Sequence, residues 1–191
     1  MEQFKLFLEL GYKHVLDING YDHILFLMVL AVPYLLENWK KVLFLVTAFT
    51  VGHCMALFLS VYGIVNVKSS LVEFLIPVTI AIAAIYNIII AKKSITQQKI
   101  GLYFFSTLFF GIIHGLGFSG YFKLMIGRQE DKLMPLLEFA LGIEIAQVII
   151  VIIVLLLGMV MQTLFKVSKR DWILVMSSIV IGLVTPMLLE R

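Results

Sequence analysis

The chain has 191 residues, of which 61% are hydrophobic and only 14% charged, and its formal net charge at pH 7 is +3. So few charged side chains could not cover a water-soluble domain of this length, so the composition excludes a soluble globular protein and predicts an integral membrane protein. No block of Lys and Arg is interleaved with aromatic residues, which excludes nucleic-acid binding. The single cysteine, Cys54, excludes an internal disulfide and a cysteine cluster for zinc or iron–sulfur binding.

The first ten residues mix acidic and apolar side chains and lack the small-residue cleavage site of a signal peptide. This pattern predicts a short amphipathic helix that lies at the membrane interface. A helix that spans the bilayer needs about 20 apolar residues. The segments that approach or exceed this length are 22–36, 42–64, 70–91, 100–120, 134–165 and 172–189. The sequence therefore predicts an all-α fold, a single transmembrane domain over residues 1–191 with about six spanning helices.

The loops between these spans are short and hold much of the Lys and Arg of the chain. The two sides of the membrane receive nearly equal numbers of these cations. The first, third and fifth loops, however, carry them in compact clusters close to helix ends. Because such clusters mark the cytoplasmic side, the pattern favours both termini outside.

The histidines are candidates for function because an ionisable residue inside a membrane is costly to keep there. His14 and His23 lie at or before the start of the first span. The second and fourth spans start on the side of the membrane opposite the N-terminus. Counted from that side, His53 lies about 18 Å into the second span and His114 about 22 Å into the fourth. All four histidines are therefore expected in the half of the membrane nearest the N-terminus.

Three carboxylates fall in the same half of the predicted bundle. Asp17 and Asp22 lie close to the first two histidines, and Glu144 lies ten residues into the fifth span, with no short route to water. Imidazole and carboxylate ligands without thiolates suit divalent zinc, nickel, cobalt or iron and disfavour copper(I). We therefore predict a one-sided transition-metal site with the ligands His14, Asp17, Asp22, His23, His53, His114 and Glu144.

Residues next to the predicted ligands are candidates for supporting roles. Thr50 shares a helix face with His53, and Gln147 with Glu144, so both are expected to contact a ligand or the ion. Glu138 either joins them or extends to the membrane surface. Glycines beside the histidines allow close helix packing, and they allow a break in the fourth span near Gly115.

Each predicted ligand also has a purely structural interpretation. His53 and His114 could be hydrogen-bonded packing residues of the bundle. Asp22 at a helix start could be a cap that interacts with the helix dipole. His14 and Asp17 could be solvated residues of the interfacial segment.

Four segments of the chain carry a family resemblance: HVLDINGYDHILF at 14–26, TAFTVGH at 47–53, HGLGFSG at 114–120 and GIEIAQ at 142–147. In these segments the chain resembles the HupE/UreJ family of bacterial membrane proteins, which is associated with nickel or cobalt uptake for hydrogenase and urease. The spacing of the first segment is closer to a divergent branch of the family. The resemblance implies a multi-pass protein of the bacterial inner membrane.

Two functions fit this pattern. In a permease for a nickel- or cobalt-like ion, Asp22, His23, His53, His114 and Glu144 would replace the hydration shell of the ion, and uptake would fall at low pH. A permease also needs an exit, which a conformational change or a homo-oligomer interface would supply. In an intramembrane enzyme, histidines would hold zinc or iron, and Glu144 would act as the base toward a lipid or membrane-anchored substrate. A structural subunit with packing histidines is a third alternative.

Overall fold

The computed structural model describes residues 2–91, 100–127 and 131–190, and all regular structure in these ranges is helical. The elements are α1 (Glu2–Val15), α2 (Asp22–Ala31), the 3-10 helix η1 (Leu36–Asn38), α3 (Trp39–Val61), α4 (Ser69–Ile90), α5 (Ile100–Ile126), α6 (Leu133–Thr163) and α7 (Lys169–Leu189). Five of the described helices, α3 to α7, are long and apolar enough to cross a membrane. The predicted all-α membrane bundle is thereby confirmed.

The prediction for the first span, 22–36, is wrong in its length. Helix α2 has only 10 residues, or about 15 Å, which is too short to cross a bilayer. Pro33 has no N–H to donate to the carbonyl oxygen of Val29, so the helical hydrogen-bond ladder cannot continue. The side chain of Asn87 in α4 donates to that carbonyl oxygen instead, at 2.7 Å. A tertiary contact therefore stabilises the early end of α2.

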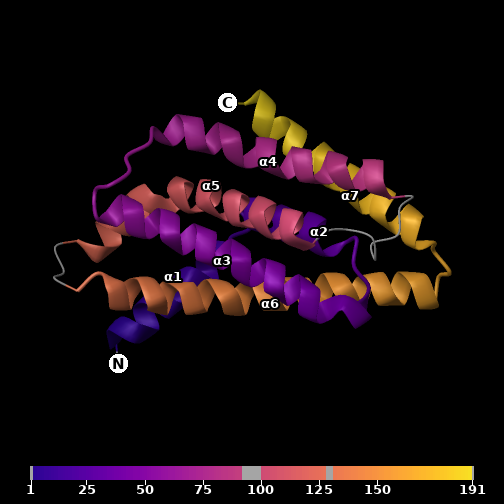
Figure 1. The fold of residues 1–191 in the computed structure, drawn as a ribbon, viewed down its shortest axis with the longest axis horizontal. Helices are drawn as coiled ribbons and strands as arrows, with labels where there is room; N and C mark the ends of the chain where they lie inside the picture. The colour runs from indigo at the N-terminus through magenta and orange to yellow at the C-terminus, as the bar shows by residue number, and fades with distance from the viewer. Residues whose placement is uncertain (1, 92–99, 128–130, 191) are drawn as a thin grey trace.

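The helices pack as a bundle with α6 along one side and the α4–α7 pair along the other, as Figure 1 shows. Helices α2, α3 and α5 lie between them. The N-terminal helix α1 packs closely against α6 and buries Phe7, Gly11 and Val15. It is thus longer than the sequence pattern indicated, and its C-terminal end reaches into the bundle.

Helices α3 and α5 approach each other more closely than side chains would normally permit. A Cβ atom at Gly52 would collide with the backbone of α5, and one at Gly111 or Gly115 would collide with the backbone of α3. These glycines therefore allow backbone-to-backbone packing of the two helices. The predicted break near Gly115 is wrong, because α5 is continuous from Ile100 to Ile126. The glycines serve packing rather than a kink.

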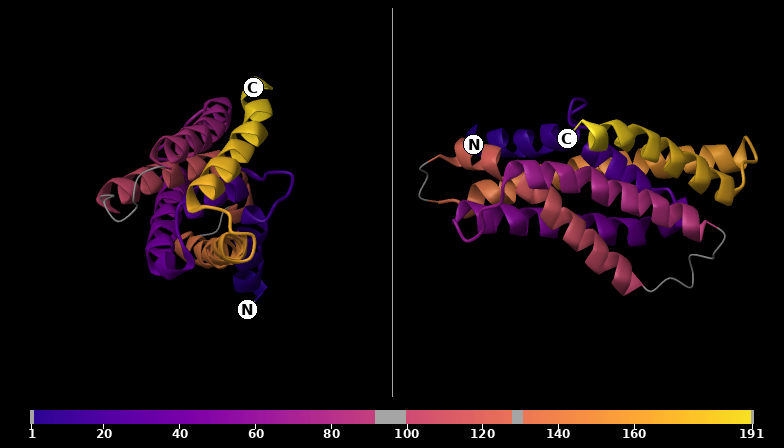
Figure 2. Two further views of the ribbon diagram at one scale, coloured as in Figure 1. Left: turned by 90° about the vertical axis from the view of Figure 1, so that its right-hand side faces the viewer. Right: turned by 90° about the horizontal axis from the view of Figure 1, so that it is seen from above.

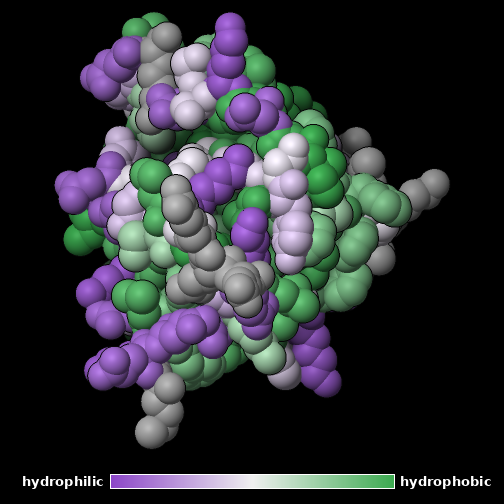
Figure 3. Space-filling model, turned by 90° about the vertical axis from the view of Figure 1, so that its left-hand side faces the viewer, coloured by the Kyte–Doolittle hydropathy of each residue, from purple (hydrophilic) through white to green (hydrophobic). Residues whose placement is uncertain are grey.

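The outside of the bundle is largely apolar, as expected where helices meet lipid. Large side chains such as Leu124, Ile89 and Phe105 are at least two-thirds exposed. Hydrophilic side chains gather at the end of the bundle shown in Figure 3. The loop between α1 and α2 instead projects from the side of the bundle, as the two views in Figure 2 show.

Candidate metal centre

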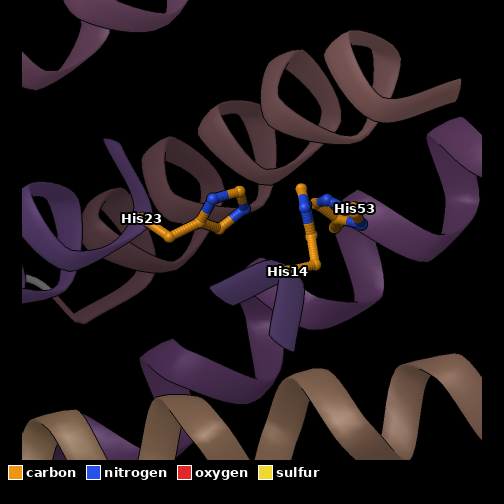
Figure 4. A group of neighbouring side chains, drawn as sticks. All are labelled: His14, His23 and His53. Atoms are coloured by element: carbon orange, nitrogen blue, oxygen red, sulfur yellow. The ribbon is translucent and has the colours of Figure 1, made fainter. Parts of the chain in front are cut away.

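Three histidines from three different helices meet inside the bundle. His14 lies in the last turn of α1, His23 in the first turn of α2 and His53 in α3. Each offers a ring nitrogen, and these nitrogens all lie within 4.8 Å of one another. Figure 4 shows the three rings converging on one point. Ring centroids are 4.6 Å apart for His14 and His23 and 5.7 Å apart for His23 and His53.

A fourth imidazole, that of His114 in α5, lies beside this group, with its ring centroid 5.2 Å from that of His23. We call the four rings of His14, His23, His53 and His114 the imidazole cluster. His114 donates a hydrogen bond from Nδ1 to the carbonyl oxygen of Phe110 at 2.8 Å. This bond fixes the ring and leaves Nε2 as the nitrogen able to bind an ion.

Local packing explains how the cluster forms. The chain reverses between His14 and His23 in a short exposed loop, so that the end of α1 and the start of α2 face each other. The close α3–α5 contact at Gly115, against the backbone of His53, brings His53 and His114 together. His53 lies about 12 Å from the end of α3 and His114 about 18 Å from the end of α5. Both therefore lie toward the same end of the bundle.

Several imidazole nitrogens of the cluster are buried without a hydrogen-bond partner. In the described part of the chain they are Nε2 of His14, His23, His53 and His114, together with Nδ1 of His53. A buried polar atom left unpaired costs about 1–3 kcal/mol. Aromatic rings such as Phe49, which lies 5.1 Å from His114 between centroids, surround the rings and offer no donor or acceptor. An ion where the nitrogens of His14, His23 and His53 meet would satisfy one nitrogen of each of these rings.

Asp22 orients the ring of His23 by contacting the nitrogen that faces away from the other imidazoles. Its Oδ1 accepts a hydrogen bond from Nδ1 of His23 at 3.0 Å, so the free nitrogen of His23 is Nε2. Metal-binding histidines commonly have such a carboxylate partner, which orients the ring and raises its basicity. The donor set thus fits zinc, nickel, cobalt or ferrous iron.

A cavity of about 1020 Å³ connects the cluster to the outside of the bundle. His14, His23 and His114 line it, whereas His53 does not. Asp17, Asp22 and Glu73 contribute carboxylates to its wall. A cleft lined by carboxylates raises the local concentration of cations.

The protein-family model described as HupE / UreJ protein matches residues 1–190. The chain belongs to the HupE/UreJ family. Neither the curated proteins nor the solved structures contain a match to it. The family match covers every residue of the imidazole cluster and confirms the resemblance seen in the sequence.

In this HupE/UreJ protein, the imidazole of His14 is suited to bind a metal ion even in mildly acidic surroundings. His14 belongs to α1, outside the five candidate spans. Burial lowers its pKa well below the usual 6.5, and the neighbouring His23 adds to this effect. The ring therefore stays neutral, which is the form that binds metal.

The structure does not bring Asp17 into the imidazole cluster. Asp17 lies in the exposed loop after α1, where Oδ1 accepts a hydrogen bond from the backbone N–H of Asn19 at 2.9 Å. It lines the cavity, so it faces an approaching cation rather than a bound one. Its local role is to stabilise the turn between His14 and His23.

Glu144 also lies outside the imidazole cluster, although the sequence suggested it as a ligand. Its carboxylate accepts hydrogen bonds from the hydroxyls of Thr47, at 2.6 Å, and of Thr50. Thr50 additionally contacts Gln147 at 2.9 Å. Glu138, six residues earlier in α6, is half-buried, and its Oε2 has no partner among the described residues.

Sequence reasoning missed three residues of this region. Thr47 binds Glu144, and its position three residues before Thr50 on the same helix face could have indicated it. Glu73, near the start of α4, lines the cavity. Phe118 packs on His14 with ring centroids 3.8 Å apart, and no sequence signal distinguishes it from other phenylalanines.

Proposed function

We propose that this protein is a permease for a divalent transition-metal ion, with nickel or cobalt as the cargo and the imidazole cluster as the binding site. One observation carries the proposal: buried imidazole nitrogens from three helices converge without any hydrogen-bond partner, and the buried ring of His114 from a fourth helix lies beside them. The association of the HupE/UreJ family with nickel and cobalt uptake supports this choice of cargo.

The cavity supports entry from one side of the membrane. Asp17 and Glu73 on its wall would attract the hydrated ion. His14, His23 and His114 would then replace water molecules of its hydration shell, and His53 would bind at the inner end. Asp22 would hold His23 in the ligating orientation.

A second cavity supports an exit on the other side of the cluster. It measures about 190 Å³ and lies between α2, α4 and α5. Phe26 and Phe110 line it, and the ring of Phe26 is also 5.4 Å from that of His114. Asn87 and Thr107 add buried polar groups to its wall. Displacement of these two phenylalanines would connect the cluster to the opposite half of the bundle.

Uptake into liposomes tests the proposal. The purified full chain is reconstituted with a fluorescent chelator inside the vesicles, and cobalt or nickel is added outside. Wild-type protein should increase the quenching rate, and His53→Ala should abolish the increase. Ser177→Ala is the matched control, because it removes a buried polar group of α7 outside the cluster. The proposal fails if wild-type vesicles take up no more metal than empty ones.

The second candidate is a metal-dependent membrane hydrolase. Three close histidines beside an open cavity also describe a catalytic zinc site, where the fourth position holds water. Glu144, the base suggested by the sequence, hydrogen-bonds Thr47 and Thr50 instead, which weakens this alternative. A chelator wash separates the two functions: an enzyme retains about one ion per chain, whereas a permease releases its cargo.

A further inference from the structure

A second polar cluster lies between α3 and α6, distinct from the imidazole cluster. Glu144 accepts hydrogen bonds on Oε1 from Thr47, at 2.6 Å, and on Oε2 from Thr50. Oγ1 of Thr50 also lies 2.9 Å from Oε1 of Gln147 and 3.3 Å from the carbonyl oxygen of Val46. Carboxylate, amide and carbonyl oxygens thus surround the hydroxyl oxygen of Thr50.

This cluster has fewer hydrogens than its contacts require. The hydroxyl of Thr50 has one hydrogen, but it lies within hydrogen-bond distance of Glu144, Gln147 and Val46. At least some of these are therefore approaches between oxygens with no hydrogen between them. The amide nitrogen of Gln147, a fully buried residue, has no partner. Exchanging the side-chain amide nitrogen and oxygen of Gln147 would satisfy its contact with Thr50. The negative charge of Glu144 would remain.

The carboxylate of Glu144 also lacks a counter-ion. The ion pairs found in the described residues join Glu9 to Lys13 and Asp22 to His23, and neither involves Glu144. Glu144 lies about 17 Å into α6, far from the helix ends where Lys and Arg gather. Cys54 lies within electrostatic range but carries no positive charge. A negative charge at this depth in a membrane requires a cation.

We propose that Thr47, Thr50, Glu144 and Gln147 form a site for a monovalent cation, either sodium or a proton. The site supplies oxygen ligands, which hard cations prefer, and its one carboxylate matches one positive charge. A proton there would supply a hydrogen that the oxygen contacts lack, whereas sodium would bind these oxygens after the side chains move apart, and either cation would neutralise Glu144. The binding of this cation is independent of the proposed permease function, whereas its role in driving transport rests on that function.

The two sites are close enough to influence each other. Thr50 and His53 are three residues apart in α3, or about 4.5 Å along the helix axis. A monovalent cation at Glu144 and a divalent ion at the imidazole cluster therefore repel each other through a medium of low dielectric constant. Because such coupling is reciprocal, entry of one cation promotes release of the other. This arrangement would couple metal uptake to export of the monovalent cation.

Labelling with dicyclohexylcarbodiimide tests the site without any transport. The reagent modifies protonated carboxyl groups inside membrane proteins, and mass spectrometry of the Glu144 peptide measures the rate in the full chain in detergent. If sodium is the occupant, sodium at ten times its Kd slows labelling about tenfold relative to choline. If a proton is the occupant, sodium has no effect and labelling falls as pH rises.

Two variants decide between a cation site and a merely structural cluster. Thr50→Val should weaken the sodium protection or shift the pH midpoint. Thr79→Val should do neither, because that hydroxyl only donates to the carbonyl oxygen of Ile76 in α4. The cobalt affinity of the wild-type protein should fall as the concentration of the occupying cation, sodium or protons, rises. The Glu144→Gln variant should still bind cobalt, but its affinity should no longer depend on that concentration.

The inference is overturned if wild-type Glu144 is not labelled, or if its labelling responds to neither sodium nor pH. It is equally overturned if Thr50→Val behaves as wild type. If instead the proposed permease function is wrong, the experiments give a different result. In that case wild-type vesicles take up no cobalt, while sodium or pH still controls the labelling of Glu144.

Discussion

Asp22 Oδ1 accepts a hydrogen bond from Nδ1 of His23 at 3.0 Å, and this contact turns Nε2 of His23 toward the other imidazoles. Asp22→Asn should therefore lower cobalt affinity about 10- to 100-fold, as expected when a carboxylate behind a metal ligand is removed. Isothermal titration calorimetry with the purified chain measures the change. Asp131→Asn is the control and should alter affinity little, because Asp131 hydrogen-bonds the backbone at the start of α6 and does not line the cavity. Equal losses in both variants would contradict the assigned role of Asp22.

Close packing of α3 and α5 predicts a specific effect on stability. Gly115→Ala places a methyl group against the carbonyl oxygen of His53 and should cost about 1–3 kcal/mol by overpacking. Gly120→Ala, in the same helix, meets no heavy atom within 4 Å and should be neutral or stabilising. Thermal unfolding in detergent compares the two variants. A Tm for Gly115→Ala at or above that of Gly120→Ala would show that the helices are farther apart than described.

Metal binding should depend on pH through the histidines. Burial and the adjacent His23 hold the pKa of His14 well below 6.5, so its ring remains neutral at pH 6.5. Affinity for cobalt should therefore change little as pH falls from 8 to 6.5. Below the lowered pKa the proton competes with the metal, and affinity should fall about tenfold per pH unit for each histidine that becomes protonated. Binding that already weakens steeply above pH 7 would contradict the burial of His14.

The general architecture could be predicted because it depends on local composition. Apolar segments of about 20 residues must be helical in a bilayer, so α3 to α7 follow directly from the sequence. The rise per residue likewise located His53 and His114 toward one end of the bundle. Both results require only counting along a helix.

Other features could not be predicted because they depend on contacts between helices. The early end of α2 requires Asn87 of α4 to bind the carbonyl oxygen that Pro33 leaves free. The position of Glu144 beside Thr47 and Thr50 depends on the rotation of α6 about its axis, which a nearly uniform apolar helix does not encode. The same holds for Gly115, whose lack of a side chain is equally compatible with a kink and with close packing.

The most direct test of the central claim is a count of bound metal. Wild-type protein, His23→Ala and His53→Ala are dialysed against cobalt or nickel, and inductively coupled plasma mass spectrometry gives the metal content per chain. The imidazole cluster predicts about one ion per wild-type chain, as its converging donors form a single site, and none in either variant. A wild-type chain that binds neither metal, or variants that bind as much as wild type, would contradict it.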